Sequence, residues 1–425
     1  MHIDRREWLK KAALLQGAFL LPESIFACTN GLTSKPFTIL IVSGWQDVNI
    51  GDIAHTPGLL HVFETLWPEA KLILWKRSKG EAVHTLLKQN FPKVKIIYGN
   101  VLDDRTVDSE DVLNAFKESD LMVHGSGPSV VGQSNLEAWV KNTQKPFGIF
   151  GTTIQHVSDS LKTLLQKASF LFTRETASLK VLEKEGLKGR NIAFAPDATF
   201  YMDIRNDQKA NTFLEDNKLQ DKKFICVIPR LRYTPYHKFR KSTNWSEEKI
   251  AHVEKVNAEK KEEDHAKLRQ AMIAYIRETG NKVLVCPEMT YEVDIMDELL
   301  IDPLPEDVRP NVIKHGYWLP DEAASVYAKA LAVLSFECHS PIMAVAIGTP
   351  SFYLRHPEDT IKGQMYYDLG FEDWVFEIEE TTGEMITERL REVWTNYDKA
   401  KKEIKGNMKK VDQIYEDRIN SIRNL

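Results

Sequence analysis

The sequence predicts an α/β protein built from two doubly wound, Rossmann-like domains and a helical carboxyl-terminal tail. Two observations lead to this fold class. Short runs of β-forming residues alternate with segments of helical periodicity, which is typical of consecutive βαβ units. The β-forming runs are apolar throughout rather than alternately apolar and polar, as expected of parallel strands covered by helices on both faces.

The first series of β-forming runs defines an amino-terminal domain, which we predict over residues 36–202. Each run is four to six residues long and is followed by a polar or glycine-containing loop. The predicted strands are residues 37–42, 71–75, 94–98, 121–124, 146–150 and 170–173.

A polar stretch at residues 202–223 interrupts the pattern, and a second series then begins, so we predict a second Rossmann-like domain over residues 223–380. Its expected strands are residues 224–228, 282–285, 312–313, 331–336 and 351–354. A long charged helix is predicted near residues 246–278, and residues 384–425 form the predicted helical tail. Two such domains facing each other across a cleft resemble the GT-B architecture of glycosyltransferases.

Composition and charge narrow the range of functions. The chain has 425 residues, with 56 Lys and Arg against 61 Asp and Glu, for a formal net charge of −5. No overall positive field is therefore available to bind a nucleic-acid backbone. The four cysteines are too scattered for a disulfide framework or a cysteine metal site, and no HExxH spacing occurs. We expect neither a metal nor a nucleic-acid partner.

Residues 1–28 have the character of an export signal. Arg5 and Arg6 precede a ten-residue apolar stretch, residues 12–21, which is too short to span a bilayer and is similar to a twin-arginine signal. Cys28 ends a sequence similar to a lipobox and is a candidate site of lipidation. Ordinary cleavage near Ala27 and an uncleaved amphipathic helix are the alternatives. The expected location is the periplasm or cell envelope, or the cytoplasm if the signal is not used.

Two candidate binding loops follow strands of the first domain, where ligands of parallel sheets bind. In the first, Asn49 and Asp52 are suited to cap a helix, and Gly51 would let the backbone approach a ligand and direct helix amides toward an anion. The second consists of His124, Gly125, Ser126 and Gly127, whose amides would be open to a carboxylate or phosphate. For the first loop taken by itself, a merely well-capped helix is the favoured explanation; for the second, a tight strand-to-helix turn explains the residues about as well.

Two further candidate loops follow strands of the second domain. Arg230 and Arg232 follow its first strand and are suited to clamp carboxylate or phosphate oxygens, although a solvated loop is the alternative. His339 is expected at the amino terminus of a helix, a position that lowers an imidazole pKa and suits hydrogen bonding or proton transfer. A capping histidine without a chemical role is the alternative there.

Taken in order, these segments resemble the polysaccharide pyruvyl transferase family. The resemblance covers roughly residues 38–380 and rests on the order and spacing of short motifs rather than on any one of them. The matching segments are residues 49–54 (NxGDxA), 119–127 (the aDlvi-GGG strand and loop), 148–155, 173–178 (the vRDxxS turn), 195–198 (PDp), and 337–340 (RxH) with 348–350 (GxP).

Members of this family transfer the enolpyruvyl group of phosphoenolpyruvate to two hydroxyls of a sugar without a metal or organic cofactor. The resemblance implies a carbohydrate acceptor, with Arg174 and Arg230 binding the anionic donor and His339 transferring protons or contacting phosphate. Residues 125–127 would line the floor of the site. Glu337 stands where the family has the arginine of RxH. A compensating positive charge is expected from Arg355, Lys362 or the cluster at residues 230–241.

Two other functions fit the same residues. Glu337 beside His339 would form an acid–base pair for a glycosyltransferase that uses a nucleotide sugar, or for another enzyme that transfers or removes a group on glycans. The third possibility is a non-catalytic carbohydrate-binding protein.

Overall fold

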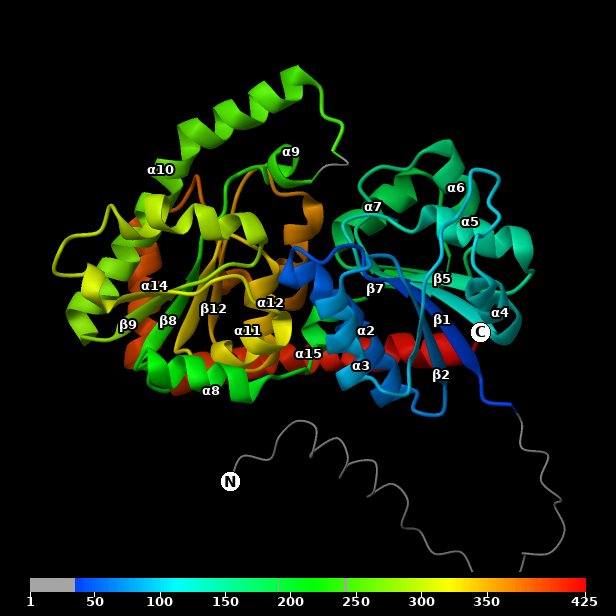
Figure 1. Cartoon of the computed structure of the whole chain (residues 1–425), viewed down its shortest axis with the longest axis horizontal. Coiled ribbons are helices and arrows are strands. Elements are labelled where there is room, and N and C mark those ends of the chain that lie inside the picture. The colour runs from blue at the N-terminus through cyan, green and yellow to red at the C-terminus, as the bar shows by residue number, and fades with distance from the viewer. Residues whose placement is uncertain (1–34, 190, 241–242) are drawn as a thin grey trace, which may run out of the picture. The chain divides into compact units, whose positions relative to one another are not determined.

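The computed structural model describes residues 35–189, 191–240 and 243–425, and residues Phe37–Leu425 group into one unit (Figure 1). The predicted export signal at residues 1–28, with Cys28, lies outside the described residues. No described helix combines the length and apolar character needed to cross a membrane.

The first sheet has seven parallel strands in the order β3-β2-β1-β4-β5-β6-β7. Its order reverses between β1 and β4, so the loops that follow these two strands diverge and leave room for a site between them. The strands are β1 (Thr38–Ser43), β2 (Lys71–Lys76), β3 (Lys95–Ile97), β4 (Leu121–His124), β5 (Phe147–Thr152), β6 (Phe170–Thr173) and β7 (Ile192–Phe194).

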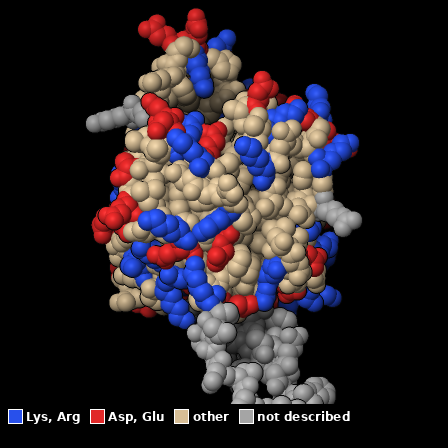
Figure 2. Space-filling model, turned by 90° about the vertical axis from the view of Figure 1, so that its right-hand side faces the viewer, with Lys and Arg blue, Asp and Glu red and all other residues tan. Residues whose placement is uncertain are grey.

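Helices cover both faces of this sheet, which explains the apolar strands. In β1, Ile39 and Ile41 belong to one buried cluster, while Leu40 and Val42 belong to a second cluster on the opposite face. The helices are α2 (Ile50–Leu66), α3 (Glu81–Asn90), α4 (Glu110–Glu118), α5 (Gln133–Asn142), α6 (Asp159–Leu165) and α7 (Thr176–Lys184). On the molecular face shown in Figure 2, basic and acidic side chains are interspersed.

The second sheet has six parallel strands in the order β10-β9-β8-β11-β12-β13, and it reverses between β8 and β11. The prediction of two doubly wound parallel sheets is therefore confirmed. The strands are β8 (Phe224–Ile228), β9 (Lys282–Val285), β10 (Val312–Lys314), β11 (Ala332–Ser335), β12 (Ser351–Arg355) and β13 (Val375–Glu377).

The helices of this half include the long charged helix that the sequence predicts. Helix α10 (Glu247–Thr279) begins after Ser246, whose side chain caps Lys249 N, and ends at Gly280, which adopts a φ of 69°. The other helices are α8 (Asp207–Asp216), α9 (Tyr236–Phe239), α11 (Pro320–Tyr327), α12 (His339–Ala346), α13 (Gln364–Leu369) and α14 (Gly383–Thr395), and the short 3-10 helices include η1 (Ala198–Tyr201) and η5 (Ile361–Gly363).

Three elements were missing from the sequence prediction. The polar stretch at residues 202–223 contains α8, which buries Ala210 and Leu214. Strands β7 and β13 were also not predicted. Both are three-residue edge strands whose residues are only partly buried, so they are shorter than the runs that mark the central strands.

The predicted carboxyl-terminal helical tail is confirmed. Helix α15 (Tyr397–Arg423) crosses back from the second sheet to the first (Figure 1). Its buried face carries Tyr415, whose hydroxyl donates to the backbone oxygen of Asp197 at 2.6 Å, and Arg418 donates to the oxygen of Phe194 at 2.8 Å. One buried apolar cluster extends from β1 through the second sheet to α15. The two sheets therefore share a continuous core.

Candidate active site

Loops from the two sheets meet at the amino terminus of α2. Asn49, just before α2, and Met289, after β9, form an isolated antiparallel bridge. The amide of Ile50 donates to the oxygen of Glu288 at 2.9 Å, and the amide of Thr290 donates to the oxygen of Val48 at 3.1 Å. The backbone thus fixes the loop after β1 against the loop after β9.

The first turn of α2 has no amide left for an anion. The side chain of Asn49 accepts from the amides of Gly51 at 2.7 Å and Asp52 at 3.1 Å, and its carbonyl accepts from Ile53. The capping explanation therefore accounts for Asn49. Gly51 permits a close approach to the helix backbone, as the sequence suggested. The group that approaches is a side chain of the protein, because a Cβ at this position would overlap the imidazole of His339.

His339 is the first residue of α12 and is 5% exposed. Its Nδ1 lies 3.2 Å from Oε1 of Glu288, and the other carboxylate oxygen of Glu288 accepts from the amide of Ser340 at 2.6 Å. Burial opposes protonation of His339, but Cys338 and Glu288 outweigh burial and raise its pKa well above the usual value. The expectation of a lowered pKa at this helix terminus was wrong, because it did not include the carboxylate.

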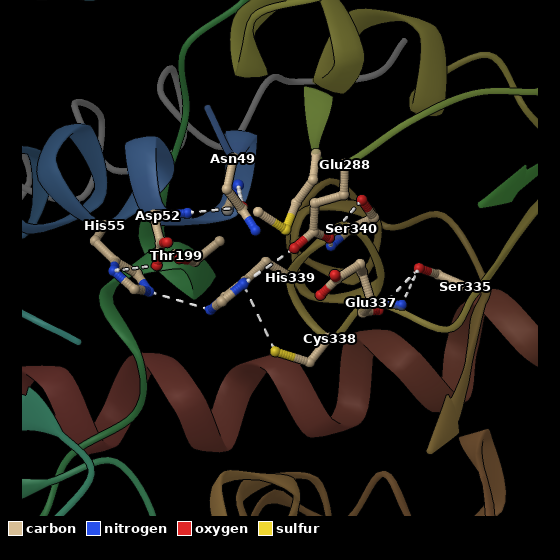
Figure 3. A network of polar contacts seen from close by, with 12 residues as sticks. Asn49, Asp52, His55, Thr199, Glu288, Ser335, Glu337, Cys338, His339 and Ser340 are labelled. Atoms are coloured by element: carbon tan, nitrogen blue, oxygen red, sulfur yellow. Dashed lines mark hydrogen bonds and ion pairs between the residues drawn. The ribbon is translucent and has the colours of Figure 1, made fainter. Parts of the chain in front are cut away.

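The other imidazole nitrogen of His339 faces the first sheet. Its Nε2 lies 3.2 Å from Nε2 of His55 on α2 (Figure 3). The same nitrogen of His55 lies 3.2 Å from Oδ2 of Asp197. Arg174 then donates from Nη1 to Oδ2 of Asp197 at 2.6 Å. His55, Asp197 and Arg174 are at most 1% exposed. A buried polar chain therefore connects Glu288 in the second half with Arg174 in the first.

Arg174 reaches His339 only through this chain. Its Nε donates to Oγ1 of Thr153 at 2.7 Å, and its Nη1 is taken by Asp197. Burial works against the charge of Arg174, but Asp197 and Glu175 more than offset it and raise the arginine pKa. The guanidinium is thus held by internal partners, and its charge also interacts with Cys338, the residue before His339.

Glu337 and Arg230 lie where the order of the second sheet reverses. Arg230 follows β8 and Glu337 follows β11, and Nε of Arg230 lies 2.9 Å from Oε1 of Glu337. Nη1 of Arg230 also donates to Oδ1 of Asp359 at 2.6 Å. Burial raises the pKa of Glu337, and Arg230 opposes that rise. Of the compensating cations expected for Glu337, Arg230 makes the direct ion pair.

Arg232 and Arg355 are directed to other partners. Arg232 forms a two-pronged contact with Asp264 on α10, at 2.8 and 3.0 Å, and also donates to Glu379 at 2.8 Å. Arg355 donates to Glu377 at 2.8 Å. The structure does not bring either guanidinium into contact with Glu337 or His339. Both guanidinium groups are instead paired with carboxylates on neighbouring elements.

The loop of residues 124–127 is integrated into the first sheet. Nε2 of His124 accepts from the amide of Gly132 at 2.9 Å, and burial lowers the pKa of His124 to about 3. Ser126 accepts from the amide of Ala198 at 3.0 Å, and the oxygen of Gly127 accepts from the amide of Thr153 at 3.0 Å. His124 is therefore neutral, and these contacts are structural.

Sequence reasoning did not single out His55, Asp197 and Glu288 as site residues. Glu288 follows β9, so the rule that ligands bind after parallel strands pointed to its loop. Asp197 lies in the matched motif at residues 195–198 but was given no role. His55 lies inside α2, and only its place three residues after Asp52 hints that both residues share one helix face.

A family model described as polysaccharide pyruvyl transferase matches residues 49–357. The chain belongs to this family. The match extends from Asn49, the residue that caps α2, to just beyond β12. It includes every side chain of the buried polar series that connects Glu288 with Arg174. No curated protein matches this family member.

Solved structures show that its fold is GT-B-like. UDP-GlcNAc 2-epimerase from Neisseria meningitidis bound to UDP-GlcNAc has a TM-score of 0.55 at 12% identity, covering 92% of this chain and 100% of its own. The S. aureus MnaA–UDP co-structure has a TM-score of 0.53 at 10% sequence identity, and the match covers 87% of this chain and 90% of its own. E. coli ADP-heptose LPS heptosyltransferase II has a TM-score of 0.50 at 11% sequence identity, and the match covers 85% of this chain and 100% of its own. At these identities the likeness concerns the fold alone.

Proposed function

We propose that this protein transfers the enolpyruvyl group of phosphoenolpyruvate onto two hydroxyls of a sugar in a cell-surface polysaccharide. The product is a cyclic pyruvate ketal, and phosphate is released. Membership of the polysaccharide pyruvyl transferase family supports the reaction class and a carbohydrate acceptor. The donor and the exact reaction are inferred from the residues around Glu337.

The observation that carries the proposal is an incompletely satisfied charged pair beside His339. Although Nε of Arg230 and Oε1 of Glu337 are only 2.9 Å apart, the N–H does not point at the oxygen. Both atoms are buried without a hydrogen-bond partner. Because buried polar atoms are nearly always hydrogen-bonded, this pair is suited to receive a polar ligand.

A second cation is available at the same place. Lys362, in η5, interacts electrostatically with Asp359, Arg230 and Glu337, yet its ammonium has no hydrogen-bond or ion-pair partner within the described part of the chain. Arg230 offers a planar fork and Lys362 a point charge, which suit the carboxylate and phosphate of the donor. Lys362 therefore partly offsets the charge of Glu337.

The reaction needs three proton transfers, one to carbon and one from each sugar hydroxyl. Protonation of the donor methylene carbon gives a methyl group and an oxocarbenium-like centre, which the first sugar hydroxyl attacks. The bond to phosphate then breaks, and the second hydroxyl closes the ketal. One hydroxyl proton replaces the proton given to carbon, and the other leaves with phosphate. We assign these steps to Glu337, which faces Arg230, and to His339, which follows it at the start of α12.

An acceptor can bind beside this donor site. A cavity of about 330 Å³ lies between the loop after Arg230 and α10. Its lining is mixed: apolar residues such as Leu231 and Leu299 lie beside four charged residues that suit sugar hydroxyls, namely Lys238, Glu254, Lys261 and Glu298. We expect Lys261→Ala to raise the KM for the acceptor with little change in kcat.

The test is phosphate release from phosphoenolpyruvate in the presence of candidate acceptor glycans. We expect Lys362→Met to raise the KM for phosphoenolpyruvate at least tenfold, because it removes a cation from the donor site. Lys329→Met is the matched control, since Lys329 is exposed. Absence of turnover with every acceptor, in the original chain and in Glu337→Arg, would contradict the proposal.

Glu337 itself favours one alternative. A carboxylate in place of the family's arginine gives an acid–base pair with His339, as required for glycosyl transfer or for removal of a group from a glycan. A thermal-shift screen separates these functions. A ligand at one hundred times its Kd stabilises the folded state by about 2.7 kcal/mol, so phosphoenolpyruvate, nucleotide sugars and pyruvylated glycans can be ranked directly. Stabilisation by a nucleotide sugar alone would favour glycosyl transfer.

We also propose that residues 1–28 direct the chain to the periplasm or cell envelope. The proposal rests on Arg5 and Arg6 ahead of the short apolar stretch. Replacing both arginines by lysine should retain the protein in the cytoplasm, as measured by cell fractionation. An unchanged distribution would count against a twin-arginine signal.

A further inference from the structure

We propose that His55, Asp197 and His339 form a binding site for a single divalent transition-metal ion, with Zn²⁺ the best match. This inference goes beyond the proposed function, whose chemistry requires no metal. Nε2 of His55, Nε2 of His339 and a carboxylate oxygen of Asp197 all lie within 4.8 Å of one another. Two imidazoles and one carboxylate are a ligand set that zinc sites use.

The spacing of these atoms suits a common ion. Nε2 of His55 lies 3.2 Å from Nε2 of His339 and 3.2 Å from Oδ2 of Asp197. In a tetrahedral site with metal–ligand bonds of about 2.0–2.1 Å, neighbouring ligand atoms are about 3.3–3.4 Å apart. Small movements of buried side chains would therefore complete three corners of such a site.

The outer nitrogens of both histidines provide a second, independent observation. Nδ1 of His339 lies 3.2 Å from Oε1 of Glu288, and Nδ1 of His55 lies 3.9 Å from Oδ1 of Asp52 (Figure 3). Metal-binding histidines usually direct their other ring nitrogen to a carboxylate or carbonyl, which fixes the tautomer. His339 has this arrangement, with Glu288 within hydrogen-bond distance of its outer nitrogen. The outer nitrogen of His55 is buried without a hydrogen-bond partner, and Asp52 is the carboxylate nearby. Both imidazoles direct Nε2 inward.

The site is buried and its local charge favours a cation. His55, Asp197 and Glu288 are fully buried, and His339 is 5% exposed. Three carboxylates contact the two imidazoles: those of Asp52, Asp197 and Glu288. Arg174 supplies one compensating positive charge through Asp197. A divalent ion would neutralise the remaining negative charge.

Three protein ligands leave a fourth position open, which is the pattern of catalytic rather than structural zinc sites. An oxygen of a substrate or of water is the expected fourth ligand. With the ion bound, Nε2 of His339 would be a ligand of the metal.

The experiment uses the full chain, purified without an affinity tag that binds metals. After treatment with a chelator, Zn²⁺, Mn²⁺ and Ca²⁺ are titrated separately by calorimetry, and bound metal is counted by mass spectrometry after gel filtration. We expect one Zn²⁺ per chain, a rise in Tm of several degrees, and little response to Ca²⁺, which prefers oxygen ligands.

Variants separate a metal site from a hydrogen-bonded cluster. His55→Gln should abolish stoichiometric Zn²⁺ binding, whereas His55→Cys should retain it because a thiolate also binds zinc. Asp52→Asn should weaken binding about tenfold through the outer nitrogen of His55. His124→Gln is the control, since His124 is a buried histidine that bonds to Gly132.

Fewer than one-tenth equivalent of Zn²⁺ together with an unchanged Tm would overturn the inference. Equal Zn²⁺ binding by the original chain and His55→Gln would also overturn it. Transferase activity is assayed separately on chelated and Zn²⁺-loaded chains. Metal binding without turnover would contradict the proposed function alone, and turnover by a chain that binds no metal would contradict the metal site alone.

Discussion

Glu337 and Arg230 face each other from the two strands at which the order of the second sheet reverses, with 2.9 Å between the carboxylate and the guanidinium. Glu337 stands where the family has an arginine. The negative charge is therefore matched by an arginine from the neighbouring strand, and that arginine is also bound to Asp359.

The two carboxylates on Arg230 should contribute differently to stability. Asp359 accepts from Arg230 at 2.6 Å and from the hydroxyl of Tyr353 at 2.5 Å, whereas Oε1 of Glu337 has no hydrogen bond. Asp359→Asn should lower the free energy of unfolding by about 3–5 kcal/mol, because it leaves a buried guanidinium incompletely paired. Glu337→Gln should cost about 1 kcal/mol or less. Urea denaturation measures both values, and equal losses would contradict this ranking.

Gly51→Ala tests the contact between α2 and α12. Alanine favours a helix over glycine by about 1 kcal/mol, but its Cβ would overlap the imidazole of His339. We expect a net decrease in Tm and at least a hundredfold loss of turnover, because His339 must move. Gly316→Ala is the control, since a Cβ there meets nothing within 4 Å. A more stable and fully active Gly51→Ala protein would exclude the close contact.

Stability should fall as the solution is acidified below pH 6.5. Burial lowers the pKa of His124 to about 3 and that of His265 to about 4. Because an unfolded histidine titrates near 6.5, the unfolded chain binds protons that the folded chain does not. At pH 4.5 each residue should cost roughly 2–3 kcal/mol. Urea denaturation from pH 7 to 4.5 measures the decline, and His124→Gln should make it less steep.

Tyr415 links the carboxyl-terminal helix to the loop that carries Asp197. Its hydroxyl donates to the backbone oxygen of Asp197 at 2.6 Å in a buried position. Tyr415→Phe should therefore lower the free energy of unfolding by about 1–2 kcal/mol while leaving the packing of the ring intact. Thermal denaturation checks the value. The comparison is Tyr367→Phe, which removes a hydrogen bond to Glu377 at an exposed position. A neutral Tyr415→Phe substitution would contradict a contribution from this bond.

The sequence predicted most of the central elements of the fold but only part of the candidate site. Parallel strands β4, β6, β8 and β9 have the predicted bounds, because buried strands are continuous apolar runs ended by polar residues. The rule that site residues follow such strands led to Arg230, Glu337 and His339. It also selected Arg232, although Asp264 of α10 binds that guanidinium.

The remaining site residues depend on contacts that a linear pattern does not contain. His55 joins the site because α2 and α12 approach each other where Gly51 has no side chain. Arg174 and Asp197 form a buried ion pair, a contact between segments 23 residues apart that the sequence pattern did not reveal. The pKa of His339 depends on Glu288, which is 51 residues away in sequence.

The return of α15 has a consequence for motion. The chain passes from the first sheet to the second near Ile204, and passes back after α14, so two covalent connections join the halves. Two connections restrict opening to a rotation about the line that passes through both, while twisting or sliding would strain one of them. Together with the apolar core that both sheets share, these two connections limit how far the halves can separate around His339.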